Sequence, residues 1–162
     1  MLVRLLYASR AVDTGVGAIE AILAQSRQYN PTCGITGILC YGGGIFLQAI
    51  EGGRMAVNEL YGHIQKDPRH KDVVLLDYEE ISERRFGGWT MGTVNLLKLN
   101  HSILLKYSEK AELDPYSASG KVSLAVLAEL MATAAIIGRA RKRHICPARA
   151  VRRVPLATGA YE

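Results

Sequence analysis

The order of strand-like and helical segments in residues 1–95 restricts the possible folds of this chain more than any other feature of its sequence. Residues 2–9 form an apolar, β-rich run that predicts a buried strand. Residues 16–28 carry apolar side chains at helical spacing, and Asn30-Pro31 ends this helix because proline disfavours helical geometry in the residue before it. The chain is therefore expected to begin with a strand followed by a helix.

Two further strands and a second helix are expected next. Residues 35–41 and 45–50 are strand-like runs joined by three glycines, which favour a hairpin because glycine adopts a positive φ without steric penalty. Apolar side chains at helical spacing over residues 57–64 predict an amphipathic helix that ends near Asp67-Pro68. The strands at residues 35–41 and 45–50 should be antiparallel neighbours.

Two final strands are expected at residues 73–81 and 86–94, on either side of a charged turn at Glu83-Arg84-Arg85. The resulting order, β-α-β-β-α-β-β, is the split βαβ pattern of ferredoxin-like sandwiches with one added strand. We therefore predict an α/β (α+β) fold in which a five-stranded mixed sheet carries two helices on one face.

Residues 122–138 predict a C-terminal helical cap. Their apolar side chains surround nearly the whole circumference of a helix, which is typical of a buried helix. The segment contains Glu129 and is shorter than the roughly 20 apolar residues that a membrane span requires. We expect this helix to cover the bare face of the sheet or to pack against another copy of the chain.

The net charge of +5 is located in the tail. Residues 139–162 hold seven of the 20 Lys and Arg residues and one of the 15 acidic residues, so the tail carries +6 and the remainder of the chain −1. We expect residues 145–162 to form a flexible basic extension. This charge leaves one alternative function open, a ferredoxin-like nucleic-acid-binding module that grips phosphate with its C-terminal tail and binds with strong salt dependence.

The usual signatures of enzymes and metal sites are missing from the sequence. It contains no nucleophile elbow, HExxH or phosphate-binding loop, and its four histidines are scattered. Its three cysteines lack CxxC spacing, which argues against a zinc site and a disulfide framework. No secretory signal precedes the first strand. We expect a cytoplasmic protein that is not an enzyme and holds no metal.

Polar side chains in apolar runs are the residues that need a functional explanation. Tyr7 lies within the first strand and Gln48 within the third, and an unpaired buried amide costs about 1–3 kcal/mol. Asn30 closes the first helix, and Trp89 and Met91 are expected at the end of the last strand.

Taken together and in this order, these residues and their neighbours resemble the BLUF family of blue-light sensors that bind flavin. The motifs are Leu6-Tyr-Ala-Ser-Arg, Asn30 ahead of Gly34-Ile-Thr-Gly, Phe46-Leu-Gln-Ala-Ile-Glu-Gly, Asp67-Pro-Arg-His and Phe86-Gly-Gly-Trp-Thr-Met-Gly. The resemblance covers residues 1–95. The chain departs from many relatives at Pro31, where they carry a second asparagine, and at Thr90, where serine is commoner.

The resemblance implies a flavin bound without a covalent link, FAD with FMN as the alternative, between the two helices and the sheet. An amide suits this role because its donor and acceptor ends can bridge a phenol to the flavin ring. The cofactor contacts that the resemblance assigns are Tyr7, Ile22, Asn30, Gln48, Ile64, Arg69 and His70.

The family mechanism implies a photoreceptor whose flavin ends in its oxidised state. Tyr7 transiently gives up an electron and a proton after light absorption, and Gln48 rotates or changes tautomer, which rearranges the hydrogen bonds around the flavin. The signal then leaves through the last strand, where Trp89 and Met91 compete for the place beside Gln48. The sequence leaves open which of the two lies there.

The resemblance to short family members implies that the output passes to a separate effector protein, because the chain has no room after the sensor for a fused cyclase or phosphodiesterase. A cyclic-nucleotide phosphodiesterase and a transcriptional regulator are the two kinds of effector we expect, together with a homo-oligomer. The expected parts are a flavin-binding sensor at residues 1–95, a helical output segment at 96–144 and the basic tail at 145–162.

Overall fold

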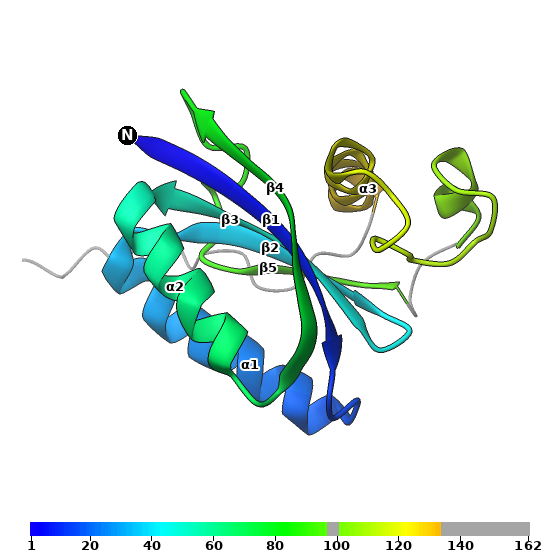
Figure 1. Cartoon of the computed structure of the whole chain (residues 1–162), viewed down its shortest axis with the longest axis horizontal. Coiled ribbons are helices and arrows are strands. Elements are labelled where there is room, and N and C mark those ends of the chain that lie inside the picture. Colours follow the sequence, from blue (N-terminus) through cyan, green and yellow to red (C-terminus); the bar gives the residue numbers. More distant parts are fainter. Residues whose placement is uncertain (97–100, 134–162) are drawn as a thin grey trace, which may run out of the picture.

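The computed structural model describes residues 1–96 and 101–133, which fold into a sheet with helices on both faces (Figure 1). The elements are β1 (Leu2–Ala11), α1 (Val16–Tyr29), the 3₁₀ turn η1 (Asn30–Cys33), β2 (Thr36–Gly42), β3 (Ile45–Gly53), α2 (Arg54–Lys66), β4 (His70–Ile81), β5 (Gly92–Asn95), the 3₁₀ segment η3 (His101–Lys106) and α3 (Gly120–Thr133). The predicted order of strands and helices is confirmed.

The five strands lie in the order β4-β1-β3-β2-β5. β1 pairs antiparallel with β3 and β4, β2 pairs antiparallel with β3, and β5 pairs parallel with β2 at the edge. This is the ferredoxin-like arrangement with one added parallel strand, so the predicted mixed sheet is confirmed. Because β1 and β3 each have a neighbouring strand on both sides, a side chain in the middle of either is shielded on both sides.

The glycine hairpin between β2 and β3 sets the register on which the site depends. Gly43 and Gly44 have φ values of 60° and 75°, which other residues rarely adopt. Starting from this turn, the ladders place Gln48 of β3 opposite Tyr7 of β1 and opposite Leu39 of β2. The two polar residues predicted to need partners are therefore neighbours across the centre of the sheet.

The predicted strand at residues 86–94 is wrong over residues 86–91. β5 begins at Gly92, and residues 86–91 form an irregular segment. The reason is that this backbone bonds to a side chain and within a turn: the Phe86 N–H donates to the carboxylate of Glu51, and the Trp89 N–H donates to the Phe86 carbonyl. Trp89 and Met91 consequently precede the last strand and do not end it.

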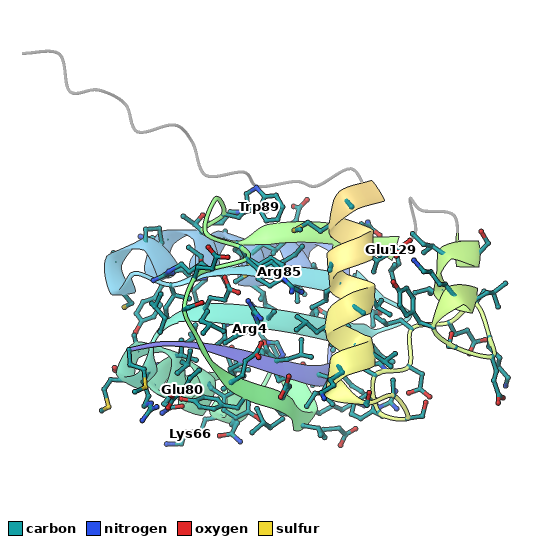
Figure 2. All side chains as sticks on the ribbon, turned by 90° about the horizontal axis from the view of Figure 1, so that it is seen from above. Arg4, Lys66, Glu80, Arg85, Trp89 and Glu129 are labelled. Atoms are coloured by element: carbon teal, nitrogen blue, oxygen red, sulfur yellow. The ribbon has the colours of Figure 1, made fainter. Side chains whose placement is uncertain are left out.

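Two apolar clusters fill the space on the two sides of the sheet. One lies beneath α1 and α2 and includes Leu5, Phe46 and Val57, and the other lies beneath α3 and includes Leu47 and Leu127. α3 crosses the face that α1 and α2 leave bare (Figure 2). The cap predicted at residues 122–138 is confirmed for residues 122–133, and its helix begins two residues earlier, at Gly120.

The predicted helical residues 134–138 and the predicted basic tail at 145–162 lie outside the described residues. Within the described residues, no helix has the length and apolar character needed to cross a bilayer.

We predict that Leu127→Ala lowers the free energy of unfolding by about 2–5 kcal/mol, because Leu127 is fully buried between α3 and the sheet. Chemical denaturation followed by circular dichroism measures this. Leu105→Ala is the control, since Leu105 is 54% exposed, and it should change the free energy by less than about 0.5 kcal/mol. Equal stabilities of the two variants would show that α3 does not cover the sheet in solution.

Candidate functional site

A pocket opens between α1, α2 and the sheet, with a volume of about 660 Å³ including its open mouth. The pocket is lined by residues from both helices, η1, β1, β3, the turn into β4, the start of β4 and the segment before β5. They are Tyr7, Ile22, Gln25, Ser26, Tyr29, Asn30, Gln48, Leu60, His63, Ile64, Asp67, Arg69, His70 and Met91.

All seven residues predicted to contact a cofactor line this single pocket, although they come from distant parts of the sequence. The other lining residues, apart from Met91 and Asp67, were not singled out from the sequence. Helical spacing could have found several of them, because Gln25, Ser26 and Tyr29 follow Ile22 on one face of α1. In the same way, Leu60 and His63 share a face of α2 with Ile64.

Tyr7 and Gln48 form a hydrogen-bonded pair at the floor of the pocket. The Tyr7 hydroxyl donates to Oε1 of Gln48, and Nε2 of Gln48 donates to Sδ of Met91 at 3.3 Å. Both ends of the buried amide are therefore engaged, which removes the cost of burying it. Trp89 packs instead against the cluster beneath α3. Of the two competing residues, the structure brings Met91 to Gln48.

The phenol of Tyr7 is held in its protonated form. Burial raises its pKa well above the usual value of 10, and the nearby Tyr61 and Asp67 raise it further. The rings of Tyr7 and Tyr61 have centroids 5.6 Å apart. A buried, protonated phenol keeps its proton available for the bond to Gln48.

His70 lies at the start of β4, with Nδ1 2.8 Å from Oγ of the buried Ser9. Burial lowers the pKa of His70 below its usual value, and Asp67 opposes this shift. The imidazole is therefore favoured in its neutral form at the pocket wall.

Arg69 joins the two helices at the pocket mouth. Its Nη2 donates to Oδ2 of Asp67 at 2.5 Å and to Oε1 of Gln25 on α1 at 2.6 Å. The hydrogen bonds from Arg69 lower the pKa of the Asp67 carboxyl. These contacts fix the turn between α2 and β4 against α1.

Asn30 carries a buried polar atom that has no hydrogen-bond partner among the described residues. Its Nδ2 donates to the Thr90 carbonyl at 2.9 Å, while its Oδ1 is buried without a hydrogen bond. An unsatisfied buried acceptor costs about 1–3 kcal/mol, so a ligand with an N–H donor would stabilise it. A flavin ring offers one such donor and an apolar surface that matches Ile22 and Ile64. The residues present therefore fit a flavin.

A metal centre has no support in this part of the chain: across residues 1–96 and 101–133, no three His, Cys, Asp or Glu side chains are grouped so as to hold an ion.

The family model BLUF, described as sensors of blue-light using FAD, matches residues 2–92. The chain is 39% identical over 74 residues to the photoactivated adenylate cyclase subunit beta of Euglena longa, which covers 45% of this chain and 9% of that protein. It is 36% identical over 88 residues to the blue light- and temperature-regulated antirepressor BluF of Escherichia coli (strain K12), covering 54% of this chain and 22% of that protein. The chain thus spans a small part of these relatives.

Solved structures of shorter proteins match over nearly their whole length. The dark-state structure of BlrB, a BLUF protein, has a TM-score of 0.68 at 37% identity and covers 81% of this chain and 95% of that one. The photo-activated state of BlsA has a TM-score of 0.74 at 28% identity and covers 88% of this chain and all of that one.

We predict that acid weakens the fold partly through His70. Since its folded pKa lies below the unfolded value of about 6.5, the unfolded chain takes up the proton first, and the free energy of unfolding falls as the pH drops from about 7.5 through this value. Urea denaturation across this range measures the decline, and His70→Gln should flatten it. His63→Gln, which keeps His70 in place, should retain it. A His70→Gln variant with the wild-type decline would contradict this assignment.

Proposed function

The chain belongs to the BLUF family, sensors of blue light using FAD, and on this premise we propose that Tyr7, Gln48 and Met91 form its light-driven switch. Domains of this family bind FAD, sense blue light and are not themselves catalysts. The relatives give no support to the alternative of a nucleic-acid-binding module.

The observation that carries the proposal is the chain of hydrogen bonds from Tyr7 through Gln48 to Met91 at the floor of the pocket. It joins a phenol, an amide and a thioether, all less than 6% exposed, that come from β1, β3 and the segment before β5. A change in the hydrogen bonds at either end of the amide therefore alters contacts among β1, β3 and the segment before β5.

The residues that would hold the flavin are those of the pocket. Ile22 and Ile64 would form apolar walls, Asn30 Oδ1 would accept from the ring N–H, and Arg69 and His70 would lie along the cofactor. FAD is the family's cofactor, and FMN is the alternative with the same ring. When bound, the flavin absorbs blue light and becomes a strong oxidant in its excited state.

Tyr7 would supply the electron and the proton, because its phenol is buried, protonated and already donates to Gln48. The amide of Gln48 has one donor end and one acceptor end. Rotation of the amide would turn Oε1 towards the Met91 sulfur, which has no proton to donate. The switched amide would thus lose its contact with Met91, and Met91 would be released.

Release of Met91 would alter the packing of α3 through β5. Gly92 follows Met91 directly, and Val94 of β5 lies in the same apolar cluster as Leu127 and Leu130 of α3. A change of about 1 kcal/mol in one hydrogen bond can bias a balanced pair of conformations, though it cannot force a large rearrangement. The signal would therefore appear as a shift in the packing of α3.

We propose on the basis of this route that residues 1–95 are the sensor and that the output segment, predicted at 96–144, includes α3. The basic tail at 145–162 stays a prediction from the sequence. The matched relatives include an adenylate cyclase subunit and an antirepressor. For this chain we propose a separate effector, a cyclic-nucleotide phosphodiesterase or a transcriptional regulator. A homo-oligomer and a cytoplasmic location stay predictions from the sequence.

We predict that Tyr7→Phe abolishes the light-induced red shift of flavin absorption while flavin affinity stays within about tenfold of the original, because only one hydrogen bond at the pocket floor is lost. Absorption spectra before and after blue light, with a flavin titration, measure both quantities. Tyr61→Phe is the matched control: it removes a neighbouring phenol that does not bond to Gln48, and it should keep the red shift. A normal red shift in Tyr7→Phe would exclude Tyr7 as the donor.

We predict that blue light increases amide hydrogen exchange in α3, because its buried contacts with the sheet loosen when Met91 is released. Exchange followed by mass spectrometry on peptides from residues 120–133 measures this in light and in darkness. Tyr7→Phe should show the dark pattern under both conditions. Identical exchange of α3 in light and darkness in the unmodified chain would contradict the output route.

A further inference from the structure

A buried ion pair lies on the sheet face opposite the pocket. Its acid, Glu51, stands in the motif that begins at Phe46, but the proposed switch gives it no role. Glu51 is fully buried and follows Gln48 by three residues on β3, so the two side chains point to opposite faces of the sheet. Its Oε1 accepts from Nε of Arg4 at 2.7 Å. Figure 2 looks onto this face, with Arg4 and Arg85 labelled beside α3.

The carboxylate of Glu51 also holds the backbone of the segment that follows β4. Oε1 accepts from the N–H of Arg85 at 3.2 Å, and Oε2 accepts from the N–H of Phe86 at 2.8 Å. The carboxylate thus satisfies two backbone donors that no strand ladder uses. A buried carboxylate is costly unless it is fully bonded, and here each oxygen has a partner.

Arg84 ties the same segment to the sheet from its other side. Its Nη1 donates to Oγ1 of Thr36 and to the Glu51 carbonyl, both at 3.0 Å, and its Nη2 donates to the Gly34 carbonyl at 2.6 Å. Three consecutive residues, 84–86, therefore bond to the side chain or the carbonyl of Glu51.

A short, anchored stretch of chain connects this attachment with the switch. The Trp89 N–H donates to the Phe86 carbonyl at 3.1 Å, and the Trp89 carbonyl accepts from the Gly37 N–H. The Thr90 carbonyl accepts from Asn30, and Met91 then reaches Gln48. Trp89 is thus held by Phe86 and by β2, and Thr90 by Asn30 of η1, so the place of Met91 depends in part on where Phe86 is fixed.

We propose that Glu51 is the positioning residue of the light switch: by bonding the backbone N–H groups of Arg85 and Phe86, it holds Met91 against Gln48 from the far face of the sheet. The inference rests on the proposed function, since Met91 is taken there as the output contact of Gln48. A tethered Met91 resists displacement, which favours return to the dark arrangement. Loosening the tether should let Met91 adapt to the switched amide and so slow that return.

The test compares Glu51→Gln with Glu79→Gln in the flavin-loaded chain. Glu51→Gln places an amide against the two backbone donors, whereas Glu79→Gln removes only the second, half-exposed partner of Arg4. We expect dark recovery of the red-shifted absorption to slow about three- to tenfold in Glu51→Gln, the effect of one or two lost hydrogen bonds, and to be unchanged in Glu79→Gln. In a Met91→Ala background, Glu51→Gln should change recovery by less than about twofold.

A second readout does not depend on photochemistry. Trp89 is the one tryptophan of the sequence, so acrylamide quenching of its fluorescence in darkness reports on this segment alone. Quenching should rise in Glu51→Gln and stay at the wild-type level in Glu79→Gln. Arg84→Met, which loosens the same segment from a less buried position, should repeat both effects and carries the test if Glu51→Gln does not fold.

Wild-type recovery and quenching in Glu51→Gln, or in Arg84→Met where that variant carries the test, would overturn the proposal. An undiminished effect of Glu51→Gln in the Met91→Ala background would also overturn it, because Glu51 would then act by another route. Absence of a light-induced red shift in the unmodified chain would instead contradict the proposed function. The quenching comparison in darkness would still decide whether Glu51 positions the segment.

Discussion

The buried amide of Gln48 is the constraint on which the rest of the site depends. It sits on an inner strand where water cannot satisfy it, so one end must find an acceptor and the other a donor. Tyr7 supplies the donor only because the β1–β3 register sets it opposite Gln48, and Met91 supplies the acceptor only because the segment before β5 turns back onto the sheet. Changing the amide therefore disturbs two other elements.

Strand β3 carries functional side chains on both faces of the sheet. β3 presents Gln48 to the pocket and, three residues later, Glu51 to the side covered by α3. The segment before β5 contacts both residues, through Met91 on one face and through the backbone of Phe86 on the other. The contact of Met91 with Gln48 and the bond of Phe86 to Glu51 lie on opposite faces, so each can be changed separately by substitution.

Periodicity predicted the strands and helices because each pattern depends on neighbouring residues alone. The family resemblance named seven cofactor contacts, and the structure brings all seven into one pocket. Residues 86–91 were predicted incorrectly as strand because the partner of the Phe86 N–H is the side chain of Glu51, which is distant in sequence and leaves no local pattern. The same distance explains why the sequence left Trp89 and Met91 as alternatives and gave no role to Glu51. Such contacts become visible only once the chain is folded.

The most direct test of the account is the visible absorption of the unmodified, flavin-loaded chain in darkness and under blue light. The account predicts that the main flavin band moves to longer wavelength, that the flavin remains oxidised, and that the original spectrum returns in darkness. A spectrum that light leaves unchanged, or one that bleaches without a shifted band, would contradict the claim that rearrangement around Gln48 is what the chain uses to register light.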